Sequence, residues 1–474
     1  MSKRLAACGL WAAAAAAQSP VAAHEELARA LKQLAVVYCA VEENFADPVV
    51  PEQAFYGGAI PGLLRALDPF STFLDPDQFR AFEDMQQSVE KGFGSVVSIA
   101  PGRVVVLQTL AGTPSARTGL AAGDEIVEIN GYRLDRLEVE PLVELLRESR
   151  QREAQLLARR PGVATLLPFA LTPAELASPS VARAFFLRPG VGYIKVASFE
   201  EATVEELRKA VEKLGGVKLR GLVLDLRDNP GGLLPAAIGT AAMFLKPGQV
   251  VLSIRARSGA PEEIKVPEKS EALTFPVAAL INGRSASGAE IVAGALQDHG
   301  RARIVGETSF GKGLVQRVFP LPEKSGLALT TALYFTPSGR SIQRPIAELP
   351  NAAPEKSGGG ITPDVAAALE GLTPFRVALE ASSSFLNFAQ QYTASRRIPA
   401  GFDVTPALLD ELQAWLSERK IRPSVSEWSA NRAYLRNRLK TEIYNLAFGV
   451  AKGDEVEAER DAQIQAAARA LGLR

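Results

Sequence analysis

The spacing of hydrophobic positions changes along the chain and divides it into regions of different expected structure. Residues 24–86 place apolar side chains at helical intervals and predict an N-terminal helical region. Residues 87–165 contain short β-type runs between glycine turns, which is typical of a small β-rich domain. Residues 166–368 alternate apolar strands with amphipathic helices, and residues 369–474 are again helical and polar.

The alternating region predicts βαβ units. Its apolar runs include "GLVLDLR" and "FPVAALING", and the helical segments between strands include "SGAEIVAGALQDH". Strands that alternate with helices of this length form sheets that are at least partly parallel. Such folds place their sites at the carboxyl ends of the strands. We therefore expect a multidomain α/β protein whose chemistry lies in this region.

Residues 1–23 have the three-part pattern of a secretory signal peptide. Lys3 and Arg4 precede an apolar stretch, and the small residues "VAA" stand before His24. The pattern predicts removal of these residues and a soluble mature protein that is secreted or periplasmic. An uncleaved membrane anchor and lipidation at Cys8 are the alternatives. No later segment approaches the roughly 18 apolar residues of a membrane span.

Composition argues against several classes of function. Lys plus Arg and Asp plus Glu both number 53, which does not fit a nucleic-acid-binding or polybasic membrane surface. The chain has two cysteines, Cys8 and Cys39, and two histidines, His24 and His299. A structural zinc site normally takes four cysteine or histidine ligands, and this small number of cysteines and histidines makes such a site unfavourable. A disulfide between the cysteines requires that the N-terminus is retained; otherwise Cys39 is a lone thiol.

Two serines stand where an apolar strand gives way to a helix, in the segment "INGRSASGAEIV". The second, Ser287, begins the helix, where free N–H groups and the positive end of the helix dipole gather. A corner of this kind suits an exposed nucleophile that has backbone donors for an oxyanion nearby. The alternative is that Ser287 only caps the helix.

Three neighbouring features favour the catalytic interpretation of Ser287. Glu290 lies one helical turn further on, and the turn "DNPGG" supplies glycine N–H groups at an equivalent sheet edge. Lys312 stands between two glycines just beyond the next strand. A buried lysine loses its proton more readily and can then act as the general base for a serine hydroxyl. The alternative for Lys312 is a surface loop.

Residues 87–165 resemble a PDZ domain. The resemblance rests mainly on "GLAAGDEIVEINGYRL", which carries a regular series of turn signals. It implies a groove that binds a chain end by strand addition and holds the terminal carboxylate with loop N–H groups. The alternative is a small β-rich insert without a ligand. The expected peptide-binding loop consists of Gly92, Phe93, Gly94 and Ser95.

The longer motifs resemble the carboxyl-terminal processing peptidases, also called tail-specific proteases. Matching segments include "LDPFSTFLDP", "GLVLDLRDNPGGLL" and "SASGAEIVAGALQDHGRARIVGETSFGKGLVQ", in the family's order. The resemblance implies a βαβ-type, crotonase-like protease core with an inserted PDZ domain, an N-terminal helical segment and a C-terminal helical region. It also implies a serine endopeptidase without metal or other cofactor, which cleaves protein or peptide substrates that have free C-terminal tails.

The family's functional positions can be carried over residue by residue. The resemblance implies a Ser-Lys dyad in which the base is a lysine, and His299, which follows the helix, is not expected to act as the base. The nucleophile falls on Ser287, the base on Lys312, and the residue that supports the base on Gln316. The oxyanion donors fall on the N–H groups of Gly288 and of Gly231 or Gly232, and the supporting carboxylate is Glu290.

Other interpretations stay open at this point. A peptide-binding scaffold with an inactive protease core is one, and a general hydrolase on a related βαβ scaffold is another. The PDZ segment is tethered at both ends, so we expect it to act as a lid whose position shifts when a peptide binds. The helical termini are candidate surfaces for a homo-oligomer or an adaptor.

Overall fold

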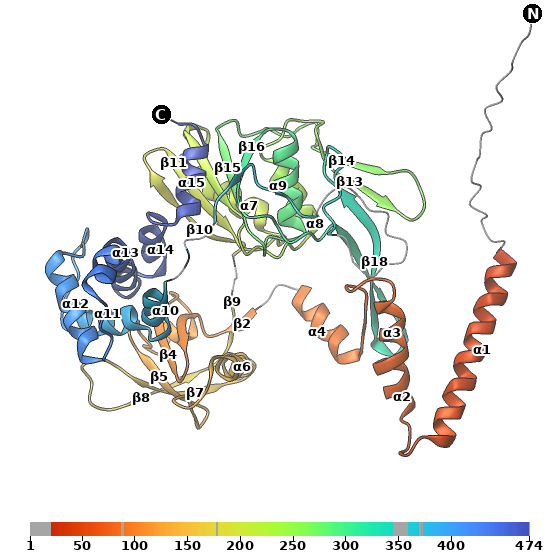
Figure 1. The fold of residues 1–474 in the computed structure, drawn as a ribbon, viewed down its shortest axis with the longest axis horizontal. Coiled ribbons are helices and arrows are strands. Elements are labelled where there is room, and N and C mark those ends of the chain that lie inside the picture. Colours follow the sequence, from red (N-terminus) through yellow and green to blue (C-terminus); the bar gives the residue numbers. More distant parts are fainter. Residues whose placement is uncertain are drawn as a thin grey trace, which may run out of the picture.

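The computed structural model describes residues 20–86, 90–176, 179–344, 359–368, 371 and 373–473 (Figure 1). Most of the expected signal peptide, residues 1–19, therefore lies outside the described residues. Within the part of the chain that is described, no helix is both long enough and apolar enough to cross a bilayer.

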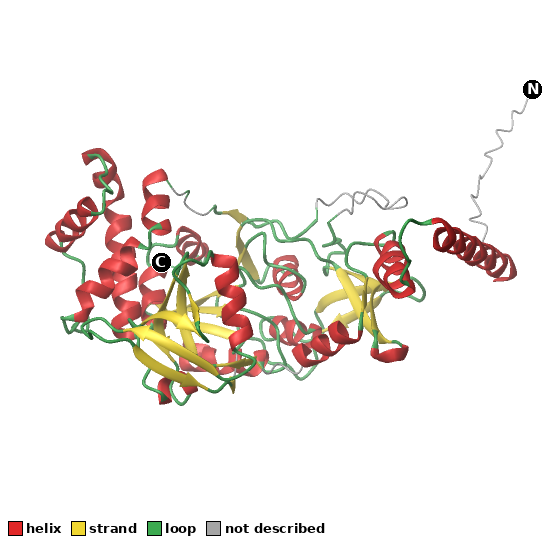
Figure 2. Cartoon of the chain, turned by 90° about the horizontal axis from the view of Figure 1, so that it is seen from below, coloured by secondary structure: helices red, strands yellow, loops and turns green. Residues whose placement is uncertain are grey.

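The N-terminal region is mainly helical, as predicted, but it also contributes a strand. Helix α1 extends away from the other elements in both views (Figures 1 and 2), and it exposes several apolar side chains, including Leu27 and Leu31. Strand β1 was not expected, and it pairs antiparallel with β18 of the protease-like region. The elements are α1 (Pro20–Asn44), α2 (Pro51–Ala54), the π-helical turn η1 (Phe55–Ala59), α3 (Ile60–Arg65), β1 (Thr72–Leu74) and α4 (Pro76–Gln86).

The next region is an antiparallel sheet with one long helix. Its first and last strands, β2 and β9, form a short two-stranded ribbon that connects it to the rest of the chain. Strands β2 and β9 pair antiparallel and bring its two ends together. In the sheet order β3-β4-β5-β7-β8, strand β3 lies at an edge. The elements are β2 (Glu90–Gly92), β3 (Ser95–Ala100), β4 (Arg103–Thr109), α5 (Pro114–Arg117), β5 (Glu125–Ile129), β6 (Tyr132–Arg133), α6 (Val139–Ser149), β7 (Ala154–Arg159), β8 (Leu167–Leu171) and β9 (Ala174–Leu176).

The central sheet has the order β10-β11-β12-β15-β16-β19, and its strands from β11 onward are parallel. This arrangement confirms the predicted βαβ units. The elements that form it are β10 (Val181–Arg188), β11 (Val191–Val196), α7 (Thr203–Lys213), the 3-10 turn η2 (Gly216–Lys218), β12 (Gly221–Asp225), α8 (Leu234–Ala242), β15 (Val277–Ile281), α9 (Gly288–Asp298), β16 (Ala302–Gly306) and β19 (Val365–Ala366).

Alternating side chains explain why both faces of this sheet are covered. In β12, Leu222 and Leu224 belong to the hydrophobic cluster that includes residues of α7, α8 and α9. Val223, which points to the opposite face, packs in a second cluster with residues of the last helix, α15. All five residues of β12 are buried, as expected for a parallel strand with helices on both sides.

A second, antiparallel sheet lies beside the central one, and it was not expected from the sequence. Strand β18 is its long middle strand, because β1, β13 and β17 all pair with it. Through β1 this sheet joins the N-terminal region to the rest of the molecule. Its remaining elements are β13 (Val250–Ala256), β14 (Glu262–Lys265), β17 (Leu314–Pro320), the 3-10 turn η3 (Pro322–Lys324) and β18 (Gly326–Phe335).

The C-terminal helices divide between two partners. Gln390 of α11 donates to Gly123 O at 2.9 Å and accepts from Arg103, which ties the helices to the β3–β8 sheet. Helix α15 instead covers the central sheet. Helix α14 ends at Ala458, and Asp461 caps the start of α15, so the end of the chain forms two separate helices. The elements are α10 (Pro374–Ala381), α11 (Ser384–Ala394), α12 (Pro406–Glu418), α13 (Val425–Phe448), α14 (Val450–Ala458) and α15 (Ala462–Ala470).

Candidate active site

Ser287 occupies the predicted corner between β15 and α9, with unusual backbone angles. Its φ is +52° and its ψ is −111°, whereas the N-cap residue of a helix normally has an extended backbone. Non-glycine residues with positive φ are strained, and such strain tends to persist at functional sites. The surrounding contacts must therefore hold this conformation, and its side chain is partly exposed.

Ser285 has a structural role at the same corner. Its hydroxyl is fully buried, donates to Leu226 O at 2.7 Å and accepts from the Asn282 N–H at 2.9 Å. These bonds tie the loop after β15 to the end of β12. Of the two neighbouring serines, Ser287 is the one whose side chain is left accessible.

Glu290 joins the segments that carry the two candidate catalytic residues. Its side chain is fully buried. One carboxylate oxygen, Oε2, accepts the backbone N–H of Ser287 at 2.8 Å and the backbone N–H of Lys312 at 2.9 Å. The other, Oε1, accepts from Ser309 Oγ at 2.6 Å and from Gly311 N–H at 2.7 Å. Burial raises the pKa of this carboxyl, and the four donors oppose that rise.

The amine of Lys312 is half-buried beside Gln316. Nζ donates to Gln316 Oε1 at 3.1 Å, and it lies 5.3 Å from the centre of the Phe70 ring. Burial lowers the pKa of Lys312 below its ordinary value. Among the described residues, no hydrogen bond joins Nζ to the Ser287 hydroxyl. The two side chains are thus held on neighbouring segments, with the amine engaged by Gln316.

The glycines of "DNPGG" lie directly against Ser287. A Cβ added to Gly231 would come within 2.8 Å of Ser287 Cβ and 3.0 Å of Gly288 N. The N–H of Gly231 donates to Asn229 Oδ1 at 2.8 Å, so it is already engaged. The N–H groups of Gly232 and Gly288 have no hydrogen-bond partner within the residues that the structure describes. Both are therefore available to a substrate oxygen.

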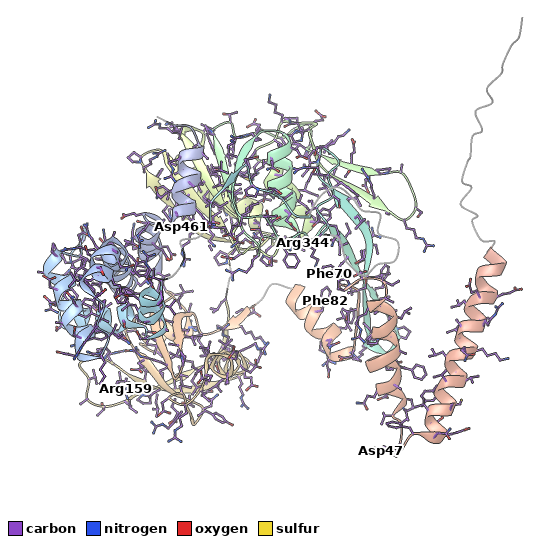
Figure 3. All side chains as sticks on the ribbon, viewed as in Figure 1. Asp47, Phe70, Phe82, Arg159, Arg344 and Asp461 are labelled. Atoms are coloured by element: carbon purple, nitrogen blue, oxygen red, sulfur yellow. The ribbon has the colours of Figure 1, made fainter. Side chains whose placement is uncertain are left out.

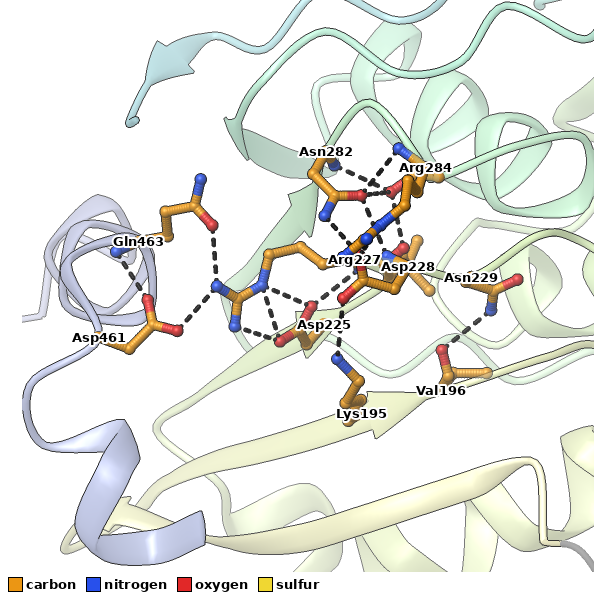
Figure 4. A network of polar contacts seen from close by, with 12 residues as sticks. Lys195, Val196, Asp225, Arg227, Asp228, Asn229, Asn282, Arg284, Asp461 and Gln463 are labelled. Atoms are coloured by element: carbon orange, nitrogen blue, oxygen red, sulfur yellow. Dashed lines mark hydrogen bonds and ion pairs between the residues drawn. The ribbon is translucent and has the colours of Figure 1, made fainter. Parts of the chain in front are cut away.

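A buried ion pair supports the start of this glycine loop (Figure 4). Arg227, two residues after β12, forms bonds of 3.0 Å or less with Asp225, and its Nη1 reaches Asp461 of the α15 cap at 2.8 Å. Burial alone would lower the pKa of Arg227, but the two carboxylates outweigh it and raise that pKa. The last helix is thereby connected to the segment that presents the candidate oxyanion donors.

His299 lies at the other end of α9. It is the C-cap residue of that helix, and its ring nitrogens contact Gln249 at 3.0 Å and Val250 O at 2.7 Å. This placement leaves the position beside Ser287 to Lys312. The described segments contain no group of three His, Cys, Asp or Glu side chains suited to a metal ion.

The four expected peptide-binding residues line a cavity of about 300 Å³ between β3 and α6. The charged residues among its lining are Lys91 and Arg150, which are both basic. The carbonyl oxygens of Phe93 and Gly94 accept from Ser115 and Leu110, at 2.9 and 2.8 Å. Within the described chain, the N–H groups of these two residues have no partner, so they are free to bind a carboxylate.

Several residues that complete the site were not expected from the sequence. Ser309 is fully buried and links Glu290 to Ile361, whose N–H donates to its hydroxyl at 2.6 Å. The Tyr334 hydroxyl donates to Lys312 O, and burial raises its pKa. Phe70 accepts a hydrogen bond from Gln316 although the two residues are 246 positions apart. The motif "LDPFSTFLDP" was the sequence signal for Phe70, but it carried no assigned role.

Residues 190–367 match the model of peptidase family S41, and residues 84–159 match the model of the PDZ domain. The chain is 37% identical over 320 residues to the carboxy-terminal-processing protease of Bartonella bacilliformis, which covers 66% of this chain and 70% of the relative. It is 34% identical over 293 residues to the carboxyl-terminal-processing protease of Synechocystis, covering 60% and 68%.

A solved structure of a photosystem II D1 C-terminal processing protease is also similar. It is 30% identical, with a TM-score of 0.43, and the match covers 68% of this chain and 84% of that one.

Proposed function

The chain belongs to peptidase family S41, and from this premise we propose that it cleaves protein substrates near their C-termini with Ser287 as nucleophile and Lys312 as base. It is a serine-type peptidase of the C-terminal processing kind. The observation that carries the residue assignment is the Glu290 carboxylate, one oxygen of which holds the backbone N–H groups of both residues. Two segments far apart in the sequence are thereby held at one point.

The proposed reaction proceeds through an acyl-enzyme. The neutral amine of Lys312 takes the proton of the Ser287 hydroxyl while the Ser287 oxygen forms a bond to the scissile carbonyl carbon. The resulting ammonium then protonates the leaving amine as the peptide C–N bond breaks. In the second half, the same amine takes a proton from water while the water oxygen bonds to the ester carbonyl carbon. The ammonium then gives that proton to the Ser287 oxygen as the ester C–O bond breaks. Since no hydrogen bond joins Nζ to the Ser287 hydroxyl among the described residues, the first step requires the amine to approach that hydroxyl, which it can do while it still donates to Gln316.

The oxyanion of the tetrahedral intermediate is assigned to the N–H groups of Gly288 and Gly232. Both are unengaged within the described residues, whereas Gly231 already donates to Asn229 at 2.8 Å. Gly288 also lies in the first turn of α9, where the helix dipole favours negative charge. Donors aimed at the developing charge are commonly the largest single contribution to such catalysis.

The substrate tail is assigned to the cavity between β3 and α6. Strand β3 lies at the edge of its sheet, so an extended peptide can add to it. The free N–H groups of Phe93 and Gly94, with Lys91 and Arg150 in the lining, suit a terminal carboxylate. We further assign this domain a gating role. Deletion of residues 88–160 should then change both the basal rate and the preference among tails; unchanged values for both would remove the gating role.

The assignment of Ser287 is tested by labelling and by product analysis. A fluorophosphonate probe should label Ser287 in the wild-type protein and should not label Ser287→Ala. Mass spectrometry of an unfolded protein substrate should show new C-termini with the wild type only. Cleavage by the Ser287→Ala protein at the wild-type rate would refute the assignment. If wild type shows neither labelling nor cleavage with a tail peptide present, the chain is an inactive peptide-binding scaffold.

Location and assembly are further parts of the proposal. Lys3, Arg4 and the apolar stretch after them support export and cleavage of residues 1–23, which N-terminal sequencing of the mature protein would test. The exposed apolar side chains of α1, such as Leu27 and Leu31, support self-association or adaptor binding through the helical termini. Light scattering of the purified protein with and without α1 would test self-association.

A further inference from the structure

A turn of the N-terminal region, residues 68–71, reaches into the candidate active site from outside both family-model matches. The Phe70 carbonyl oxygen accepts from Gln316 Nε2 at 2.8 Å, and the Phe70 ring lies 5.3 Å from Lys312 Nζ. Figure 3 labels Phe70 where the N-terminal elements meet the protease core. The turn thus contacts the base and the residue that supports it.

The direction of the Gln316 amide follows from this contact. A carbonyl oxygen only accepts hydrogen bonds, so Phe70 O requires the NH₂ group of Gln316 on its side. The amide oxygen must then face Lys312, to which Nζ donates at 3.1 Å. Without Phe70 O the amide is free to rotate by 180° and to present a donor to the amine. An amine that donates to Gln316 keeps its lone pair for the proton of Ser287.

Buried contacts hold the turn in place. Asp68 is 7% exposed, and its Oδ1 accepts the N–H groups of Phe70 and Ser71, each at 2.7 Å. Its Oδ2 accepts the Ser71 hydroxyl at 2.7 Å. That hydroxyl accepts the N–H of Thr330 on β18 at 3.1 Å, and Thr330 is the register partner of Gln316. Asp68 therefore sets the position of Phe70 relative to the strand pair that carries Gln316.

We propose that the 68–71 turn is a positioning element of the Ser287–Lys312 dyad. The Phe70 carbonyl orients Gln316, the Phe70 ring shields the amine of Lys312 from water, and Asp68 holds both in place. This inference rests on the proposed function. It also makes the N-terminal region a working part of the enzyme, although neither the protease nor the PDZ family model extends to these residues.

The ring acts on Lys312 in two opposite ways. Its face attracts the ammonium, which favours the protonated form, but at 5.3 Å this attraction is near the end of its range. Its bulk excludes water, which favours the neutral form. Among the described residues, the titratable side chains bonded to Lys312 are Glu290 from α9 and Tyr334 from β18, and Asp68 bonds to Phe70 within the turn. None of them is removed when the ring is changed, so a Phe70 variant reports on the ring.

The test is the pH dependence of kcat/KM with one tail-bearing peptide. In the wild type, kcat/KM should rise with pH as Lys312 loses its proton, and we call this rise the alkaline limb. Phe70→Ala should move the midpoint of this limb upward by about one pH unit and lower kcat/KM at neutral pH about tenfold, because water reaches the amine. Phe70→Leu, which keeps an apolar cover, should stay close to wild type. The matched control is Phe73→Ala, in the same segment, whose ring stacks on Tyr56 at 5.2 Å. It should reduce thermal stability and leave the limb unchanged.

Asp68 is tested by a graded pair of variants. Asp68→Ala removes all three acceptor contacts and should lower the plateau value of kcat by about 10- to 100-fold with little change in KM, because the base is misplaced. Asp68→Asn retains an acceptor oxygen for the two N–H groups and should recover most of that loss. Circular dichroism and thermal melting of both variants show whether the fold is intact.

The outcomes separate this inference from the proposed function. A wild-type limb in Phe70→Ala, or an equal shift in Phe73→Ala, would overturn the role of the ring. A kcat loss in Asp68→Ala that Asp68→Asn does not relieve would overturn the role of the acceptor contacts. If Lys312→Ala is inactive while the Phe70 and Asp68 variants behave as wild type, only the positioning role fails. If Lys312→Ala is active, the proposed function itself fails.

Discussion

Two helices of this chain begin with the same local pattern and use it differently. Helix α9 starts with "SGAE", from Ser287 to Glu290, and α13 starts with "SVSE", from Ser424 to Glu427. In both, the glutamate carboxylate accepts the serine N–H, at 2.8 Å in α9 and at 2.9 Å in α13. This contact is one half of a capping box.

The contacts beyond the box distinguish the two helix starts. Ser424 has an extended backbone, with φ −63° and ψ 159°, and its hydroxyl completes the capping box by accepting from Glu427 N–H at 3.2 Å. Ser287 has a positive φ, and Glu290 gathers three further donors from positions 19 to 22 residues later. The shared pattern, a serine followed three positions later by a glutamate, is thus an ordinary cap in α13 and the centre of a candidate active site in α9. Long-range partners, not the pattern, make the difference.

The largest expected difference is between the effects on kcat/KM of replacing Ser287 and of replacing Ser424. Ser287→Ala should reduce kcat/KM by about 10⁴- to 10⁶-fold, since it removes the nucleophile. Steady-state cleavage of a tail-bearing peptide measures the effect, with thermal melting to show that the protein is folded. If Ser287→Ala lost stability and kept its activity, the two helix starts would be equivalent and the comparison would break down.

Removal of the base should have the next largest effect. Lys312→Ala should reduce kcat/KM by about 10²- to 10⁴-fold. In the wild type, a lysine base acts when neutral, so activity should rise as pH rises through its pKa. Because burial lowers this pKa, the limb should lie below the ordinary lysine value of 10.5. The control is His299→Ala, which should keep most of the activity; an inactive His299→Ala enzyme would point to a different base.

The two glutamates should differ in what they stabilise. Glu290→Gln places an NH₂ group against buried N–H donors, and each buried donor left without a partner costs about 1–3 kcal/mol. It should also lower kcat about tenfold or more, since the Ser287 and Lys312 segments lose their common acceptor. Chemical denaturation and kinetics measure the two effects. Glu427→Gln is the matched control, and equal losses in both variants would contradict the distinction.

The smallest effect is expected at the ordinary cap. Ser424→Ala should cost about 1 kcal/mol of stability, because one capping hydrogen bond is lost at an exposed helix end. Its kcat/KM should remain at the wild-type value. Denaturant unfolding followed by helical signal measures the loss, and a large fall in activity would mean that α13 communicates with the site.

The elements that are regular in sequence were the ones predicted well. The helix after "SGAE" and the buried strands "GLVLD" and "VAALI" follow directly from their apolar runs, and the α/β fold class with its PDZ domain and helical termini is confirmed. The antiparallel sheet around β18 was missed. Its strands pair over long sequence distances, for example β1 with β18, and no local pattern records such pairing.

For the site, the sequence indicated which residue types matter but not how they meet. Glycine spacing pointed to Gly231 and Gly232 equally, and only the contact with Asn229 distinguishes their N–H groups. The roles of Phe70 and Ser309 depend on hydrogen bonds to Gln316 and Glu290 that cross the fold. Residue identity predicts chemistry, whereas hydrogen-bond direction and backbone strain emerge only when distant segments pack together.

The ribbon of β2 and β9 has a consequence for how this protein acquires diversity. Its paired strands put the entry and exit of the PDZ domain side by side, with Glu90 opposite Leu176 and Gly92 opposite Ala174. A domain whose ends are adjacent can be exchanged with little change in the backbone of the host fold at the point of insertion. We therefore expect that the PDZ domain can be replaced by a related domain without a change in the central sheet, as long as the contacts of Gln390 with Gly123 and Arg103 are kept.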